Sequence, residues 1–537
     1  MPIKHYATKP LKYKNLCPSF ILGDFSFLVF DTRDHSVFGA RDQFGVRPFY
    51  YYAAHDRFVA ASTIGALLQS NVSDAIDDHG MADFVAGAFS DTCITLYRDI
   101  KRLPPGHWIR VDARHLRMEP YWALPEAERE ARHDQAEEFQ HIFEQAVQCR
   151  MTGATSGSLL SGGLDSSSIA MVAQRCLTER QSAPLPSFSM TFHATPKWNE
   201  GAFIHAVLNA GQFMPHFLPS DDHDPLSAMA TMLTEQEGPF LAYNHSVSRR
   251  LYRFARQTGV DTLLDGHGGD EVVSHGFGRL NELAMDRRWL RLWREAGGIA
   301  PLFGMSTRKV ISPYLDHVRT IRRARASWRR MTGSIQHNTA LGELSTSLVA
   351  PDLARRTDVE ERQQKIQPNR SAYQTERERH REVLSSPHQP YAFEILDRAA
   401  VAANISLLFP FYDRRLVELC VSLPSSAKLA DGYSRAILRG AMKNILPEAV
   451  RLRRDKFDFT GQLATGLSRH VDYLLNAIGR RGDILAPYVD LDVARASIQR
   501  LKHPQSAGTA QVFPAWRVAT LLHWLDTSAG QPKIMGE

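Results

Sequence analysis

Residues 159–170 read LLSGGLDSSSIA and place two glycines, four serines and one carboxylate between an apolar run and a helical pattern. The run that ends at Leu160 predicts a strand, and the apolar spacing of Ile169, Val172 and Cys176 predicts a helix. The first N–H groups of a helix have no intrahelical partner, so they suit an anion. This stretch therefore predicts a phosphate-binding turn in an α/β fold.

Seven residues of the turn are candidates to bind the phosphates of a nucleotide: Leu160, Ser161, Gly162, Gly163, Asp165, Ser166 and Ser167. The glycines let a phosphate approach the backbone, and the hydroxyls add donors. A carboxylate beside a polyphosphate is repulsive unless a divalent cation lies between them, so Asp165 predicts Mg²⁺ as well as ATP. A serine- and glycine-rich helix cap without a ligand is the alternative.

The pattern SGGxDS resembles the ATP-pyrophosphatase loop, whose enzymes cleave ATP between its α and β phosphorus atoms. The chain has no GxxxxGK[ST] sequence, so a Walker-type loop and transfer of the γ-phosphate are not expected.

A second strand-to-turn pattern, LLDGHGGDEVVSHG, occupies residues 263–276. Loops at the carboxyl ends of neighbouring parallel strands converge, so we expect Asp270 to share the magnesium ion with Asp165. Gly266, Gly268 and Gly269 are further candidates to contact the nucleotide. A plain turn with solvated acids is the alternative.

Three further stretches, PFYDRRLVELCVSLP at 410–424, YSRAILRGAMKNILPEAVRLRRDKFDF at 433–459 and WRVATLLHWL at 516–525, complete a resemblance to the asparagine synthetase family. That family also includes β-lactam synthetases and the cyclases that close lasso peptides. The resemblance runs from about Gly23 to Leu525. It implies an α/β synthetase domain with a parallel sheet and an adenine-nucleotide α-hydrolase-like, ATP-pyrophosphatase fold, preceded by a truncated, antiparallel β-rich amidotransferase-like (Ntn-type) domain.

The resemblance also suggests catalytic residues. Lys456 matches the lysine of the family's R-x-K motif, which implies that it reaches the acyl-adenylate and the leaving phosphates; a surface lysine is the alternative. Arg435 and Arg439 are candidates for phosphate contacts or ordinary charges on a helix face. His267 could accept a proton from an attacking amine, or serve as a hydrogen-bonded structural residue.

Patterns along the chain predict the domains. Short β-branched and aromatic runs at 23–62 predict an antiparallel meander, and alternating strand-like and helical runs from about 150 to 266 predict a parallel sheet covered by helices. Residues beyond 280 are expected to be mostly helical. We expect a truncated, inactive class II glutamine amidotransferase-like domain at 1–125 and the synthetase domain at 130–537.

Two departures from the family affect the expected substrate. Cys17 lies outside the context of the family's catalytic cysteine, and about half of the amidotransferase domain is missing, so we expect no glutaminase activity. Ser406 and Leu408 stand where asparagine synthetases usually have a glutamate and an arginine. Losing two charges suits a peptide better than aspartate and weakens the β-lactam synthetase alternative.

These observations favour an ATP-dependent amide ligase that adenylates a peptide's Asp or Glu side chain and joins it to the amino terminus, as a lasso-peptide macrolactam synthetase does. A precursor-processing protease and a leader-binding protein are possible partners. An ammonia-using asparagine synthetase, an RNA-modifying ATP-pyrophosphatase and an inactive scaffold are the alternatives.

Composition and charge limit the cellular location and the binding partners that can be expected. The chain has 537 residues, 43% hydrophobic and 23% charged content and a net charge of +6. It shows neither a signal peptide nor a long uncharged apolar run, so we expect a cytoplasmic protein without a membrane partner. Its five cysteines include no CxxC pair. The basic stretch at 319–330 is either a solvated helix face or a binding site for nucleic acid or an acidic peptide. A nucleic-acid partner is not expected.

Overall fold

The structure is a computed structural model, and it describes residues 17–151, 155–192, 200–221, 224–319, 346–366, 375–454, 460–504 and 509–530. The N-terminal part contains the strands β1 (Ser26–Asp31), β2 (Ser36–Arg41), β3 (Tyr50–Ala53), β4 (Phe58–Ala61), β5 (Lys101–Arg102), β6 (His107–Val111) and β7 (Leu116–Pro120), with the helices α1 (Ile64–Gln69) and α2 (Asp78–Ala86).

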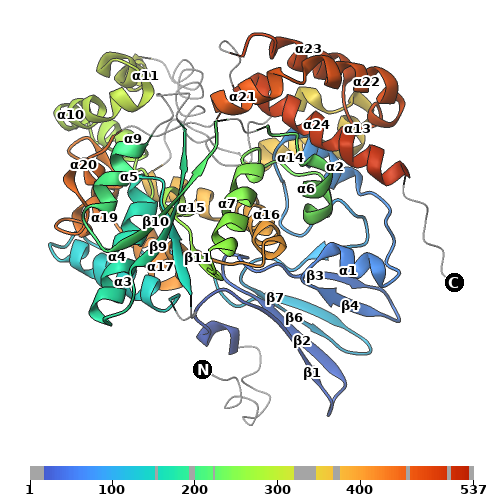
Figure 1. Cartoon of the computed structure of the whole chain (residues 1–537), viewed down its shortest axis with the longest axis horizontal. Coiled ribbons are helices and arrows are strands. Elements are labelled where there is room, and N and C mark those ends of the chain that lie inside the picture. The colour runs from blue at the N-terminus through green and yellow to red at the C-terminus, as the bar shows by residue number, and fades with distance from the viewer. Residues whose placement is uncertain are drawn as a thin grey trace.

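The middle of the chain forms a five-stranded parallel sheet in the order β10-β9-β8-β11-β12 (Figure 1). Its strands are β8 (Ser156–Leu159), β9 (Leu185–Thr191), β10 (Phe213–Pro219), β11 (Thr262–Leu264) and β12 (Ser406–Leu408). The helices that come between them up to β11 are α4 (Leu164–Glu179), α5 (Gly201–Leu208), α6 (Met229–Gln236) and α7 (His245–Gln257), and α3 (Gln135–Gln148) precedes β8. This confirms the predicted parallel α/β sheet.

The order of these strands positions the functional site. The chain moves outward from β8 to β9 and β10, then returns to the other side of β8 for β11 and β12. In doubly wound sheets, ligands bind at the carboxyl ends of the strands where the winding reverses. That point lies between β8 and β11, the two strands that precede the predicted turns.

The N-terminal strands differ from the expected meander. They form a four-stranded sheet in the order β1-β2-β6-β7 and a three-stranded sheet in the order β4-β3-β5, so β2 and β3 are not neighbours. The carboxylate of Asp42 accepts hydrogen bonds from the N–H groups of Phe44, Val46 and Arg47 and thereby folds the connection between them. The prediction of antiparallel strands is confirmed, but the prediction of one continuous meander is wrong.

Helices make up most of the rest of the chain. They are α8 (Gly269–Val273), α9 (Arg279–Met285), α10 (Trp289–Ile299), α11 (Thr307–Arg319), α13 (Pro351–Thr357), α14 (Val359–Ile366), α15 (Glu376–Leu384), α16 (His388–Ala402), α17 (Arg414–Ser422), α18 (Ser425–Lys428), α19 (Ala436–Ala441), α20 (Glu448–Arg451), α21 (Thr460–Ser468), α22 (Val471–Leu485), α23 (Leu491–Arg500) and α24 (Thr509–Gly530). A short hairpin of β13 (Leu429–Ala430) and β14 (Tyr433–Ser434) lies before α19.

The N-terminal part of the chain and the C-terminal helices share a hydrophobic core. Phe84 of α2 and Trp516 of α24 are both buried in one cluster with residues of α6 and α22. The buried Arg517 adds a hydrogen bond from its Nη1 to the carbonyl of Val85 at 2.9 Å. Figure 1 shows α24 and its neighbours packed beside α2 and α6, so the N-terminal part is held against the C-terminal helices.

Most of the basic stretch at 319–330 lies outside the described residues. Within the described part of the chain, the structure contains no helix that is both long and apolar enough to cross a membrane.

Candidate nucleotide site

The turn between β8 and α4 is held by its own serines and by a left-handed glycine. Ser161 and Ser166 hydroxyls lie 2.9 Å apart, and the Ser161 N–H donates to Ser166 Oγ at 3.2 Å. Gly162 has a φ of +73°, which a side chain would rarely adopt, and a Cβ there would lie 2.9 Å from Phe203. Ser161 is exposed and Gly163 is half-buried, whereas Leu160, Gly162 and Ser167 are buried, so Ser161 and Gly163 are the parts of this turn most open to a ligand.

The second turn packs tightly against the first. A Cβ on Gly266 would lie 2.9 Å from the backbone nitrogen of Ser166, and a Cβ on Gly269 would lie only 2.2 Å from the carboxyl carbon of Asp165. Gly268 has a φ of +97° and lies against the ring of Tyr412. These glycines therefore bring the two turns together.

Arg435 joins the acidic residues of both turns. Its Nη1 lies 2.6 Å from Asp165 Oδ2 and 2.9 Å from Asp270 Oδ1. Burial opposes the charge of this side chain, but the two carboxylates outweigh it and raise the pKa of Arg435. Arg435 lies directly before α19. Its φ of 54° is a left-handed backbone conformation that is unusual for a non-glycine residue. Such strain often marks functional sites.

Asp165 and Asp270 are the residues that would hold a magnesium ion. Because both oxygens contact the same nitrogen, they lie no more than about 5.5 Å apart, the sum of the two distances. Mg²⁺ prefers carboxylate oxygens at about 2.1 Å and keeps several water or phosphate ligands. No cluster of three or more metal-ligating side chains occurs among the described residues. A magnesium ion held by Asp165 and Asp270 would take its remaining ligands from water or phosphate oxygens.

Three further arginines contact the first turn or the β13–β14 hairpin that precedes α19. Arg439 donates from Nε to the Ser434 carbonyl at 2.8 Å, and burial together with the charge of Arg435 lowers its pKa to about 10. Arg453 donates to the Gly162 carbonyl at 3.3 Å and pairs with Glu200 at 2.6 Å. Arg454 lies 4.1 Å above the ring centre of Tyr433. The site thus holds four arginines, of which Arg435 and Arg453 are paired with carboxylates.

Lys456, the predicted catalytic lysine, lies outside the described residues. The sequence interpretation also did not single out Arg453, although it stands three positions before Lys456 in the same basic run. Its contact with Gly162 could not be read from spacing, because the two residues come from distant parts of the chain.

His267 lies in an aromatic surrounding. Its ring centre is 5.5 Å from Phe393, 5.9 Å from Phe409 and 6.2 Å from Tyr412. Its backbone N–H donates to Asp265 Oδ1 at 2.8 Å, and burial raises the pKa of Asp265. The residue is half-buried.

The two substituted positions of β12 lie at opposite ends of that strand. Leu408 pairs with Leu264 at the carboxyl end, beside the second turn, and is partly buried in the main core. Ser406 pairs with Thr262 at the other end and is exposed. Only Leu408 therefore lies at the edge of the sheet where the turns converge.

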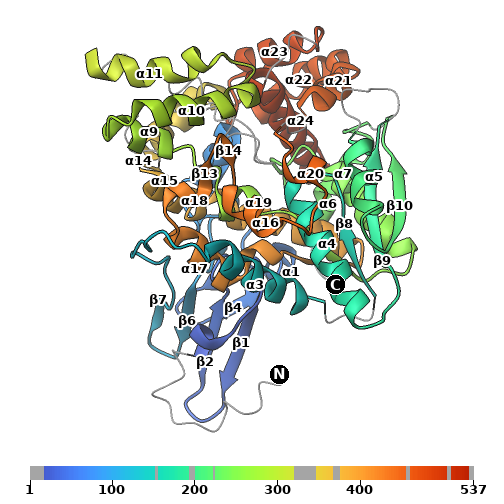
Figure 2. The same cartoon turned by 90° about the vertical axis from the view of Figure 1, so that its left-hand side faces the viewer.

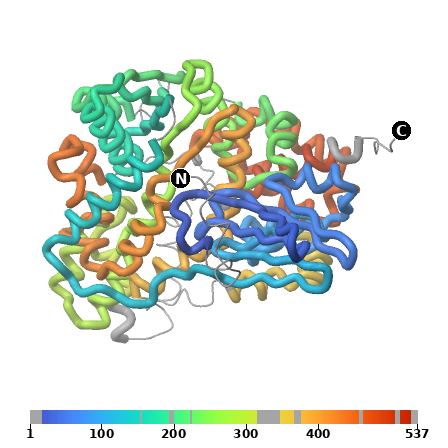
Figure 3. The backbone as a smooth tube through the Cα atoms, turned by 90° about the horizontal axis from the view of Figure 1, so that it is seen from below, coloured from blue at the N-terminus to red at the C-terminus, as the bar shows by residue number. Residues whose placement is uncertain are grey.

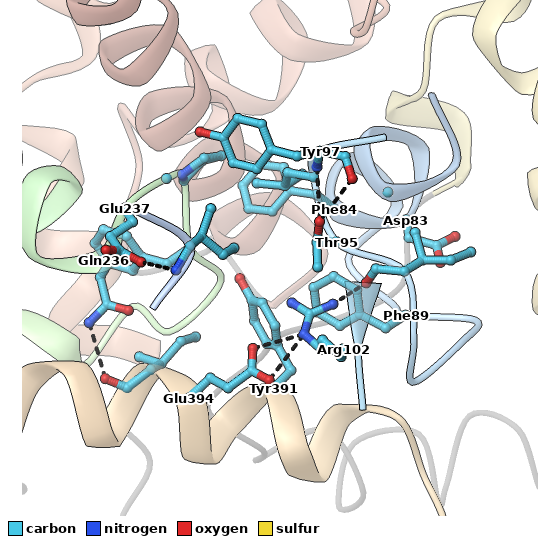
Figure 4. A pocket seen from close by; sticks show the side chains of 18 of the residues that line it. Asp83, Phe84, Phe89, Thr95, Tyr97, Arg102, Gln236, Glu237, Tyr391 and Glu394 are labelled. Atoms are coloured by element: carbon cyan, nitrogen blue, oxygen red, sulfur yellow. Dashed lines mark hydrogen bonds and ion pairs between the residues drawn. The ribbon is translucent and has the colours of Figure 1, made fainter. Parts of the chain in front are cut away.

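A separate pocket lies where the N-terminal part meets α16 (Figure 4). Glu394 accepts hydrogen bonds from Arg41 at 3.2 Å and from Arg102 at 2.9 Å. Although burial opposes its ionisation, Arg102 and Arg41 hold the pKa of Glu394 below its usual value. Phe393, the neighbour of Glu394 on α16, contacts His267, so this helix connects the pocket wall to the second turn.

The fold and site define the class of the protein. A parallel sheet with a serine- and glycine-rich turn, paired carboxylates and surrounding cations is an ATP-pyrophosphatase-like α/β architecture. The sequence profile named "Asparagine synthase" matches residues 138–526, and the profile named "Glutamine amidotransferase domain" matches residues 13–122. The chain belongs to the asparagine synthase family, whose members are ATP-dependent ligases. This confirms the resemblance seen in the sequence.

Similar proteins include asparagine synthetases from several organisms. The chain is 23% identical to "Asparagine synthetase [glutamine-hydrolyzing] 3" of Bacillus subtilis over 461 residues, which are 83% of this chain and 68% of that protein. It is 27% identical to "Putative asparagine synthetase [glutamine-hydrolyzing] 2" of Methanocaldococcus jannaschii over 53% of this chain and 56% of that protein. "Amidase chyE" of Penicillium rubens is 24% identical over 48% of this chain and 41% of that protein.

Proposed function

We propose that this protein is an ATP-dependent ligase that adenylates a side-chain carboxylate of a peptide and joins it to an amine of the same peptide, closing a macrolactam ring. The observation that carries the proposal is the placement of Asp165 and Asp270 on one guanidinium nitrogen, because this pair can present a magnesium nucleotide to a carboxylate. Magnesium would neutralise the charge of the phosphates and polarise them for attack.

The protein's own residues would bind and orient ATP. Gly162 and Gly163 would admit the phosphates, and Ser161 would donate to them. Arg435 would stabilise negative charge at the reacting phosphorus together with Lys456, the lysine expected from the family motif. The substrate carboxylate would form a bond to the α-phosphorus as pyrophosphate leaves. The amine would then attack the acyl carbon, AMP would leave, and His267 is a candidate to accept the proton.

The carboxyl end of β12 supports a peptide substrate. Leu408 is partly buried there, at the edge of the sheet where the two turns converge. Free aspartate carries charges that would need charged partners when they leave water, whereas a peptide tolerates an apolar wall. Holding both reacting groups in one molecule would also make ring closure intramolecular and therefore faster.

The environment of Cys17 supports the absence of glutamine hydrolysis. Partial burial raises the pKa of its thiol, whereas a cysteine nucleophile needs the thiolate. We accordingly propose a non-hydrolytic amidotransferase-like domain at 1–125 and a synthetase domain at 130–537, with the nucleophile supplied as an amine. A processing protease and a leader-binding protein would prepare the peptide.

The test is incubation of the protein with ATP, Mg²⁺ and linear peptides that carry a free amino terminus and one Asp or Glu at varied positions. Mass spectrometry should show the loss of one water from the peptide, with release of AMP and pyrophosphate. Asp165→Asn should abolish both products. Release of ADP would refute cleavage between the α and β phosphorus atoms.

A second candidate is an asparagine synthetase that uses ammonia, and the similarity to proteins named asparagine synthetases favours it. The same assay separates the two functions. Formation of AMP that requires aspartate and ammonium, and that peptides do not stimulate, would replace the macrolactam proposal with this one.

A further inference from the structure

The short helix α8 carries Asp270 and depends on the rest of the protein for its support. It spans five residues and ends at Ser274, whose φ of 64° leaves the helical region. The last carbonyls of a helix have no intrahelical partner, so a buried helix end needs donors from elsewhere. The carbonyl of Glu271 is one of these groups, and Glu271 follows Asp270 directly. The group that holds this carbonyl therefore helps to set where Asp270 lies.

A buried chain of hydrogen bonds reaches this carbonyl from two other helices. His380 of α15 lies 2.9 Å from the Glu271 carbonyl oxygen through its Nε2, and Lys428 of α18 lies 2.9 Å from His380 Nδ1 through its Nζ. His380 and Lys428 are 1% and 0% exposed. Figure 2 shows α15 and α18 side by side. Three segments that are far apart in the sequence thus meet at the end of α8.

The partners of His380 fix its tautomer. The Lys428 Nζ brings hydrogen atoms to Nδ1, so Nδ1 accepts and the proton of a neutral imidazole lies on Nε2. Nε2 then donates to the Glu271 carbonyl, which can only accept. Burial and the charge of Lys428 hold the pKa of His380 well below its usual value, so the ring is neutral. The other tautomer would place a lone pair against the carbonyl oxygen, so only one tautomer satisfies all three groups.

A second residue of α15 holds the segment that follows α8. Glu376 and His380 are four positions apart, so they share one face of the helix. The Glu376 carboxylate accepts hydrogen bonds from Ser274 Oγ and, at 2.8 Å, from the Gly278 N–H. The helix α15 therefore holds the chain on both sides of the bend at Ser274.

The helix α15 is itself well anchored. At its first turn, Thr375 Oγ1 accepts from the Glu378 N–H at 3.2 Å, and the Glu378 carboxylate accepts from the Thr375 N–H at 2.9 Å. Next to His380, Arg381 Nη1 donates to the Leu124 carbonyl at 3.1 Å, in the linker between β7 and α3. Figure 3 shows this linker running across the molecule from the N-terminal strands toward α3. These bonds make α15 a fixed support for α8.

We propose that His380 and Lys428 are positioning residues, which hold α8 so that Asp270 stays beside Asp165 for the binding of a magnesium nucleotide. Their role rests on the magnesium site of the proposed function, and it does not depend on which carboxylate is adenylated. A shift of α8 would move Asp270 and would also change the close contact between Gly269 and the Asp165 carboxylate. Groups that orient metal ligands from behind typically contribute about 10–100-fold to metal affinity or activity.

Calorimetric titration with Mg–ATP tests the proposal, because it needs no peptide substrate. His380→Leu removes the donor to Glu271, and Lys428→Met removes the group that fixes the tautomer. Each substitution should raise the dissociation constant of Mg–ATP by about tenfold or more. His380→Gln should bind Mg–ATP as the unmodified protein does, because its amide nitrogen reaches about as far as Nε2 and can donate.

A double variant and a matched control separate positioning from general stability. Lys428 acts through His380, so the variant with both His380→Leu and Lys428→Met should bind no more weakly than His380→Leu alone. His245→Leu is the control, because His245 is 2% exposed but lies on α7, and its dissociation constant for Mg–ATP should not change.

Hydrogen exchange of the ligand-free protein gives a readout that does not involve the nucleotide. Exchange should become faster at residues 269–278 in His380→Leu and in Lys428→Met, because these variants lose the support of α8. It should not change at residues 213–219, which form the strand β10 at the far edge of the sheet.

Several results would overturn the proposal: an unchanged dissociation constant in Lys428→Met or His380→Leu, additive effects in the double variant, or binding by His380→Gln as weak as that of His380→Leu. If His380→Leu does not fold, Lys428→Met and its hydrogen exchange decide the question. Binding of Mg–ATP without ring closure would refute the macrolactam proposal alone, whereas an unmodified protein that does not bind Mg–ATP would refute both.

Discussion

Replacing Gly269 with alanine should disable the nucleotide site without unfolding the protein. A Cβ at this position would lie 2.2 Å from the carboxyl carbon of Asp165 and 2.4 Å from its Oδ1. Carbon atoms in contact normally lie about 3.5 Å apart or more, so one of the two groups must move by more than about 1 Å. Asp165 cannot move freely, because Arg435 Nη1 contacts both of its carboxylate oxygens at 2.6 and 2.7 Å.

The expected effect is larger on activity than on stability. Misplacing a catalytic group by about 1 Å can reduce the rate about 100-fold. Overpacking a buried position typically destabilises by about 1–3 kcal/mol. We therefore expect AMP formation to fall by about two orders of magnitude, with a weaker affinity for Mg–ATP and a modest decrease in melting temperature.

Pyrophosphate release gives the rate, isothermal titration calorimetry gives the affinity, and thermal unfolding gives the stability. Gly440→Ala in α19 is the control, because its Cβ would meet only Ala136 at 3.6 Å, an ordinary contact. If Gly269→Ala binds Mg–ATP and forms AMP as the unmodified protein does, the position of the Asp165 carboxylate does not matter and the reasoning fails.

Other substitutions test the charges of the fold. Arg435→Met should leave two carboxylates facing each other and destabilise the protein by about 3 kcal/mol, and added Mg²⁺ should restore part of the lost melting temperature; no recovery would argue against a cation site at these carboxylates. Burial lowers the pKa of His245 to about 4, so its unfolded form binds a proton more readily and stability should fall by about 3 kcal/mol as pH decreases from 6.5 to 4. His245→Gln should flatten this dependence in thermal unfolding, whereas His115→Gln, at a side chain that is 62% exposed, should not. Glu394→Ala should leave the buried Arg41 and Arg102 without their shared carboxylate and lower the free energy of unfolding, measured by chemical denaturation, by about 3–5 kcal/mol. An unchanged midpoint of unfolding would show that these ion pairs are dispensable.

Local chemistry was sufficient to predict a parallel sheet with β8, β9 and β11, but not that β10 and β12 also join it. Glycines and serines at 161–168 and glycines at 266–269 follow apolar runs that the structure shows to be β8 and β11. The prediction succeeded because strand, turn and helix signals lie within a few residues of each other. The prediction of an N-terminal meander was wrong because the β1–β2 and β3–β4 hairpins, joined by the turn at Asp42, belong to different sheets. Alternation of apolar residues does not encode which sheet a strand joins.

The sequence by itself determined that a serine- and glycine-rich turn begins a helix, that two acidic turns follow parallel strands, and that the chain resembles the asparagine synthetase family. These properties are local, or they depend on residue order alone. Only the tertiary structure decided that Arg435 lies between Asp165 and Asp270, that Gly269 makes room for the Asp165 carboxylate, and that His267 lies among aromatic rings. These contacts join residues that are far apart in the chain, so they exist only after packing has brought separate elements together.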